Sequence, residues 1–198
     1  MRHAFAAVGG VLIDVVSTIE PHEFDFVATD QWNVRELLAH TLRSFSLIGS
    51  YLDGPFIDGS CATAGEYFRR ALADSVTHNQ IAERGRQSAV QLTDPLTQTR
   101  VAVEDGLTRS ADAADNLIMS SFMGQIPFGE YLRTRLVEAT LHSLDLIDAL
   151  GRSVELPPLA LRLTVDALID AASSETLTTI ARAVSGRGAL APAFNILG

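Results

Sequence analysis

Apolar residues recur at three- and four-residue intervals through most of this 198-residue chain, and no other feature constrains its fold as strongly. The alternation of polar and apolar residues that marks a half-buried strand is nearly absent. The chain is therefore expected to be an all-α bundle with a C-terminal helical extension. The spacing predicts helices over residues 3–19, 33–52, 62–90, 95–110, 128–150, 159–173 and 175–185.

Several of these helices carry residues that favour a defined beginning or end. Asn33 is a good N-cap, and Glu36, three positions later, completes a capping box. Pro95 follows Asp94 and suits the first position of another helix, where its missing N–H costs nothing. Gly151 is expected just beyond the end of the helix over residues 128–150.

Two segments are less regular than the rest of the chain. The stretch 62–90 is more polar than its neighbours, and Thr77 is a plausible second N-cap, which predicts a break near that residue. Residues 116–127 are apolar but contain Gly124 and Pro127. We expect an irregular connection or a short extended piece there.

The net charge limits the classes of partner, and the cysteine content limits the covalent cross-links within the chain. The 24 acidic residues exceed the 15 basic ones, and the net charge of −9 argues against a nucleic acid or an anionic membrane as a partner. A single cysteine excludes an internal disulfide framework. With no signal peptide pattern and no run of 18 apolar residues, a cytoplasmic location is expected. We expect a small-molecule substrate as the partner. The sequence leaves open whether the chain forms a homodimer.

Three polar residues border the core-facing stripes of two predicted helices. Glu138 and His142 are spaced i, i+4, which places them one turn apart on one helix face, and His40 lies beside the apolar face of another helix. Two imidazoles and one carboxylate can hold a divalent metal and leave positions open. A lone histidine beside an apolar face is also common in a satisfied core, and a Glu-x3-His pair is common on surfaces. Spacing alone leaves these alternatives open.

Two motifs carry a resemblance to a known family. Trp-x-Val-x-x-Leu-x-x-His occupies residues 32–40, and Glu-x3-His-x2-Asp occupies residues 138–145. With these motifs, residues 1–151 resemble the DinB/YfiT-like metal-binding bundle, and more closely the N-terminal domain of the mycothiol-dependent maleylpyruvate isomerase family. The resemblance implies a four-helix bundle with one long crossover over residues 1–151. The helical pattern of residues 152–198 predicts a C-terminal extension packed on that bundle. It also implies zinc or nickel on three ligands, His40, Glu138 and His142.

The resemblance further implies a metal-dependent enzyme that uses a low-molecular-weight thiol. Ser143-Leu144 stand where the family usually has Gly-Trp, and residues 152–198 look helical where the full isomerase has an α/β domain. A mycothiol-type S-transferase or isomerase acting on a small electrophile is therefore expected, with the transferase favoured over the maleylpyruvate isomerase reaction itself. The alternatives are a catalytically silent metal-binding or dimerising protein, and a hydrolase with water on the metal. Asp145 either hydrogen-bonds His142 or is a surface carboxylate.

Five other residues invite a functional interpretation but favour a structural one. Cys61 is expected to be an inert small hydrophobe rather than a reactive thiol. Trp32, just before the N-cap of its helix, is expected to anchor the core rather than to contact a substrate. Met119, Phe122 and Met123 are expected in the core rather than against a cofactor.

Overall fold

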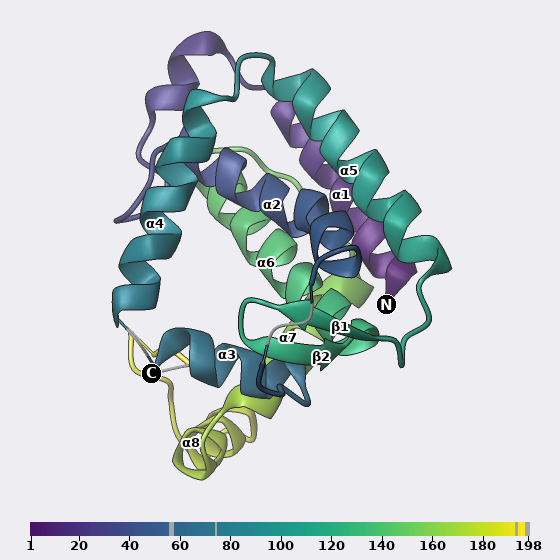
Figure 1. Cartoon of the computed structure of the whole chain (residues 1–198). Helices are drawn as coiled ribbons and strands as arrows, with labels where there is room; N and C mark the ends of the chain where they lie inside the picture. Colours follow the sequence, from purple (N-terminus) through teal and green to yellow (C-terminus); the bar gives the residue numbers. More distant parts are fainter. Residues whose placement is uncertain (56–57, 74, 193, 197–198) are drawn as a thin grey trace.

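The computed structural model describes residues 1–55, 58–73, 75–192 and 194–196, and of residues 72 and 75–79 the backbone alone. The described residues form eight α-helices, one 3-10 helix and a single two-stranded hairpin, so the all-α prediction is confirmed (Figure 1). The elements are α1 (Arg2–Val16), η1 (Pro21–Asp25), α2 (Val34–Leu52), α3 (Ala64–Leu72), α4 (Ser75–Val90), α5 (Pro95–Asp112), β1 (Ile118–Ser121), β2 (Gly124–Pro127), α6 (Phe128–Ala149), α7 (Pro158–Ala171) and α8 (Ser174–Val184).

Helices α1, α2, α5 and α6 form the bundle, and each of α1 and α2 packs against both α5 and α6. Phe5 on α1 and Phe45 on α2 stack at the centre, with ring centroids 4.5 Å apart. Two glycines let the helices approach closely, because a Cβ at Gly106 would lie 2.9 Å from the Phe45 backbone and one at Gly9 would lie 2.7 Å from Val103. The result is a closely packed core with large side chains fully buried.

The predicted caps are present at the start of α2 and at the end of α6. The Asn33 side chain accepts the Glu36 N–H at 2.9 Å, and the Glu36 carboxylate accepts the Asn33 N–H at 3.1 Å, so the capping box is confirmed. Gly151 has a φ of +59°, and the next residue, Arg152, donates its N–H to the Ile147 carbonyl at 3.0 Å. This is the Schellman arrangement that ends α6.

The connection between α2 and α5 contains α3 and α4, and α4 packs along α2 (Figure 1). The expected break in this segment exists, but Thr77 is not its N-cap, because α4 begins at Ser75 and Thr77 lies in its first turn. A hydroxyl residue is tolerated both at a cap and within the first turn, so its position fixes a helix start only to within a few residues.

Residues 116–127 contain a short extended piece, one of the two alternatives expected for this segment. Strands β1 and β2 pair antiparallel, with Ser121 opposite Gly124 and Ile118 opposite Pro127. The hairpin packs on the bundle through buried Met119 and Ile126. Phe128 then begins α6 directly after the second strand.

The C-terminal helices differ in how they contact the bundle. Helix α7 packs against α6 and α3, and it buries Ala160, Ala167 and Ala171 in the same core as the bundle. Helix α8 has no buried residue and lies at the periphery (Figure 1). The division of the chain at Gly151 into two domains stays a prediction. Among the helices that the structure describes, none has both the length and the apolar character needed to cross a membrane.

Candidate metal centre

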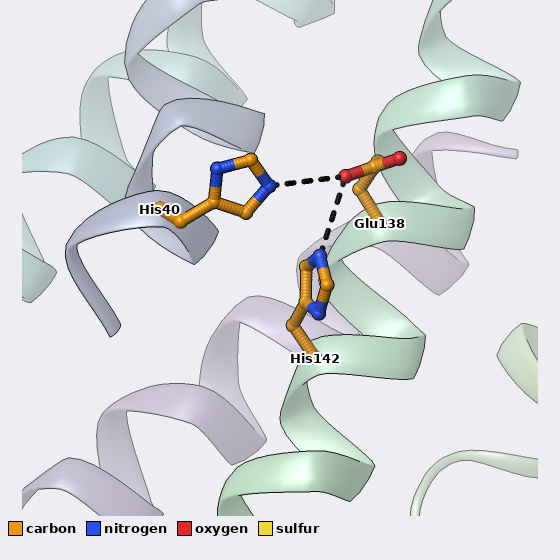
Figure 2. A group of neighbouring side chains, drawn as sticks. All are labelled: His40, Glu138 and His142. Carbon is orange, nitrogen blue, oxygen red and sulfur yellow. Dashed lines mark ion pairs between the residues drawn. The ribbon is translucent and has the colours of Figure 1, made fainter. Parts of the chain in front are cut away.

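Two neighbouring helices bring the three predicted ligands together. His40 lies two turns into α2, and Glu138 and His142 lie one turn apart on α6, which packs beside α2. Figure 2 shows both imidazoles pointing at the same carboxylate. The Nε2 atoms of His40 and His142 each lie 3.4 Å from Oε2 of Glu138. The side chains are mostly buried, with exposed fractions of 12% for His40, 25% for Glu138 and 20% for His142.

These distances suit a shared metal ion. One donor atom from each residue lies within 4.8 Å of the other two, and no further carboxylate, imidazole or thiolate joins the group among the described residues. Around a tetrahedral ion with ligand distances of about 2.0–2.1 Å, donor atoms are roughly 3.3–3.4 Å apart. The separation of 3.4 Å between each Nε2 and the carboxylate oxygen has that value. The donors present therefore fit a three-ligand site with a position left open.

The charges of the three side chains differ in the metal-free protein. Burial opposes ionisation of Glu138, but the adjacent His142 and His40 imidazoles outweigh it and hold the pKa of Glu138 well below its usual value. Burial also opposes the charged form of His142, but Asp145 and Glu138 raise the pKa of His142 to about 9. Burial lowers the pKa of His40. Near neutral pH, Glu138 is thus ionised, His142 is protonated and His40 is neutral.

Each histidine is held by a different neighbour. Nδ1 of His142 lies 3.1 Å from Oδ2 of Asp145, so Nε2 is left to face Glu138. Asp145 therefore contacts His142, as one of the two sequence-based alternatives proposed. Nδ1 of His40 is buried and has no hydrogen-bond partner among the described residues. The Trp32 ring stacks on His40 instead, with centroids 4.5 Å apart and an angle of 26° between the planes.

A cavity of about 300 Å³ lies beside the three side chains, which form part of its wall. Trp32 packs against the core as expected, but its ring also lines this cavity. Phe122 and Met123 line it too. Met123 also packs against the core and Met119 is buried, as expected, whereas Phe122 is exposed, which corrects its expected place in the core. Phe122 lies in the turn of the β1–β2 hairpin, which places its side chain away from the core.

Cys61 does not join the group of donor atoms. It is buried, and burial raises the pKa of its thiol, as an inert thiol requires.

Three arginines in the cavity wall were missed by sequence reasoning. They are Arg43 on α2, Arg84 on α4 and Arg135 on α6. Helical spacing contains a signal for two of them, because Arg43 follows His40 by three residues and Arg135 precedes Glu138 by three. No comparable spacing marks Arg84, which reaches the cavity through the packing of α4 on α2.

Comparison with protein families gives one match. The model of the mycothiol maleylpyruvate isomerase N-terminal domain matches residues 15–147, a range that contains the three side chains of the centre. Comparisons with curated proteins and with solved structures returned no significant match. Helices α7 and α8 lie beyond the matched range.

Proposed function

The chain belongs to the mycothiol maleylpyruvate isomerase N-terminal domain family, and on that premise we propose that it is a metal-dependent enzyme using a low-molecular-weight thiol. In this proposal, His40, Glu138 and His142 bind a divalent ion, zinc or alternatively nickel. A thiol of the mycothiol type then reacts with a small electrophile, as in an S-transferase.

One observation carries this proposal. The three donor atoms converge in the wall of a cavity, and no fourth donor closes the group among the described residues. A structural metal site is usually closed by four protein ligands, whereas a catalytic site keeps a position for water or substrate. A cavity of about 300 Å³ is also large enough to admit small reactants beside the donors.

A divalent ion at this position would supply positive charge that favours the thiolate form of a coordinating thiol. The residues of the chain contribute orientation and shielding. Asp145 fixes the orientation of His142 through its Nδ1 atom, and the Trp32 ring holds the His40 imidazole in place. Aromatic side chains, among them Phe68 and Phe122, supply apolar surface in the cavity wall.

A conjugation assay tests the proposal. Protein reconstituted with zinc or nickel is mixed with mycothiol and monochlorobimane, and fluorescence follows the product. The sulfur–carbon bond forms, the carbon–chlorine bond breaks, chloride leaves, and the thiol proton passes to solvent. We expect acceleration that needs the metal, is lost in His142→Ala, and persists in His22→Ala, whose imidazole is exposed.

The other outcomes identify the alternatives. Bound metal without any acceleration of thiol conjugation would contradict the transferase and favour a catalytically silent metal-binding protein. Metal-dependent hydrolysis of an ester such as p-nitrophenyl acetate, with no need for a thiol, would favour a hydrolase with water in the open position.

A further inference from the structure

The three arginines of the cavity wall lack the ion pairs that six of the other twelve arginines make among the described residues. No ion pair joins Arg43, Arg84 or Arg135 to a carboxylate among the residues that the structure describes. Elsewhere in those residues, ion pairs to aspartate or glutamate occupy six arginines, Arg2, Arg70, Arg86, Arg109, Arg133 and Arg152. Glu138 is the one acidic side chain in the described cavity wall.

Arg135 is held in the cavity wall by neutral groups. It is 7% exposed, and its guanidinium donates to the Tyr67 hydroxyl at 3.2 Å and to the Thr134 hydroxyl at 3.1 Å. The Tyr131 ring lies 5.0 Å from the guanidinium carbon. These contacts orient the group but supply no negative charge, and the carboxylate that acts on Arg135 electrostatically is Glu138 of the same wall.

Arg84 and Arg43 are also poorly compensated. The guanidinium carbon of Arg84 lies 4.8 Å from the centre of the Phe122 ring, and its Nη2 atom is buried without a hydrogen-bond partner among the described residues. Burial, followed by the charges of Arg84 and Arg135, lowers the pKa of Arg43. Arg43 therefore lies close enough to the other two arginines for their positive charges to act on its own.

Such an arrangement is costly without an anion. Taking a charged group out of water is unfavourable unless an opposite charge or hydrogen bonds replace the water. Glu138 cannot compensate three arginines, and in the proposed function its carboxylate also binds the metal. The three arginines lie together in this wall although the chain as a whole has a net charge of −9.

We propose that this cavity binds a small organic anion, with a carboxylate or phosphate group among Arg43, Arg84 and Arg135. Arginine is well suited to both groups, because its planar guanidinium can donate two parallel hydrogen bonds to them. The carbon body of the ligand lies against the apolar side chains of the wall, Phe68, Phe122 and Met123. The anion site needs no metal, and only the further step of identifying this anion as the electrophile rests on the proposed function.

Isothermal titration of the metal-free protein tests the site with three probes. Benzoate and phenyl phosphate carry the two candidate anionic groups, and benzamide is a neutral analogue of benzoate. The buffer contains neither phosphate nor carboxylate. We expect at least one anion to bind about tenfold or more tightly than benzamide, since one well-made charged contact is worth about that factor. The tighter of the two anions identifies the group that the arginines recognise.

Variants then locate the binding. Arg43→Gln and Arg84→Gln should each weaken binding of the preferred anion about tenfold or more. Arg100→Gln removes the same charge from an exposed position on α5 and should change affinity less than about twofold. Circular dichroism establishes that each variant is folded, and two independent cavity variants keep the test valid if one of them does not fold.

Several outcomes would overturn the anion site. The proposal is wrong if neither anion binds or if benzamide binds as tightly as the anions. It is also wrong if Arg100→Gln loses as much affinity for the preferred anion as the cavity variants do. The failure of this site is distinguishable from the failure of the proposed function. His40→Ala should lose metal but keep the anion, whereas Arg43→Gln should lose the anion but keep metal.

Discussion

Nδ1 of His142 lies 3.1 Å from the Asp145 carboxylate, on the side of the ring opposite the Nε2 atom that faces Glu138. In metal sites such a carboxylate fixes the orientation of the ring and makes its other nitrogen a better ligand. The contact therefore places Asp145 in the proposed centre, although it does not face the cavity directly.

Asp145→Asn should lower zinc affinity by about 10–100-fold, the usual effect of removing such a partner, when the affinities are corrected for the protonation of His142. The asparagine keeps the size of the side chain but loses the negative charge that supports His142. Asp148→Asn is a matched control, since Asp148 is exposed on the same helix and should leave the affinity unchanged. Competition with a chromophoric chelator measures both variants, and equal affinity in the two would remove Asp145 from the centre.

Metal binding should release about one proton between pH 7 and 8. His142 must be neutral to bind metal, but Asp145 and Glu138 raise its pKa to about 9 in the metal-free protein. Affinity should therefore increase as the pH rises toward about 9 and level off above it. An ordinary histidine would place this change near pH 6.5.

Calorimetry in buffers of different ionisation enthalpy counts the released protons. The expected heat depends on the buffer near neutral pH, and this dependence should shrink in Asp145→Asn. A heat that is the same in all buffers would show that His142 is not protonated before binding.

Gly85→Ala should disturb the centre from a distance. A Cβ at Gly85 would lie 2.9 Å from the indole nitrogen of Trp32, the ring that stacks on His40. We expect a loss of about 1–3 kcal/mol in the free energy of unfolding, typical of overpacking. The fluorescence of Trp32, the single tryptophan of the chain, should change as well.

Gly10→Ala is the matched control, because a Cβ at this position in α1 meets no atom within 4 Å. It should stabilise the helix by about 0.5–1 kcal/mol without altering the fluorescence. Urea denaturation followed by fluorescence and circular dichroism measures both changes. A Gly85→Ala protein as stable as the parent would contradict the close contact of α4 with Trp32.

Zinc should stabilise the folded chain by mass action. A ligand at 100 times its dissociation constant adds about 2.7 kcal/mol, which corresponds to roughly 5–10 °C in melting temperature for a chain of this size. His40→Ala should abolish the increase, whereas His22→Ala should retain it because the His22 side chain is 67% exposed. An equal increase in both variants would indicate that zinc binds elsewhere.

Local features of the fold could be predicted because they depend on residues close in sequence. The capping box of Asn33 and Glu36 and the Gly151 ending of α6 both involve residues within one or two turns. The β1–β2 hairpin was harder to predict, because its two-residue turn is Phe122-Met123 rather than the Asn-Gly or Asp-Gly that marks such turns.

The part of the site that lies on a single helix could be predicted from helical spacing. The pair Glu138 and His142 follows from the i, i+4 rule, whereas the approach of His40 to that pair depends on the packing of α2 beside α6. The stacking of Trp32 on His40 and the position of Arg84 depend on tertiary packing in the same way. A single sequence contains no simple signal for such contacts.

We propose that His40, Glu138 and His142 hold a metal with a position open to a thiol. The visible and near-ultraviolet spectrum of the cobalt-substituted protein tests it most directly, because sulfur bound to cobalt gives a charge-transfer band. Addition of mycothiol should produce this band in the parent protein, and not in His142→Ala, which loses one ligand while the neighbouring core residues stay in place. A cobalt spectrum that mycothiol leaves unchanged would contradict the claim.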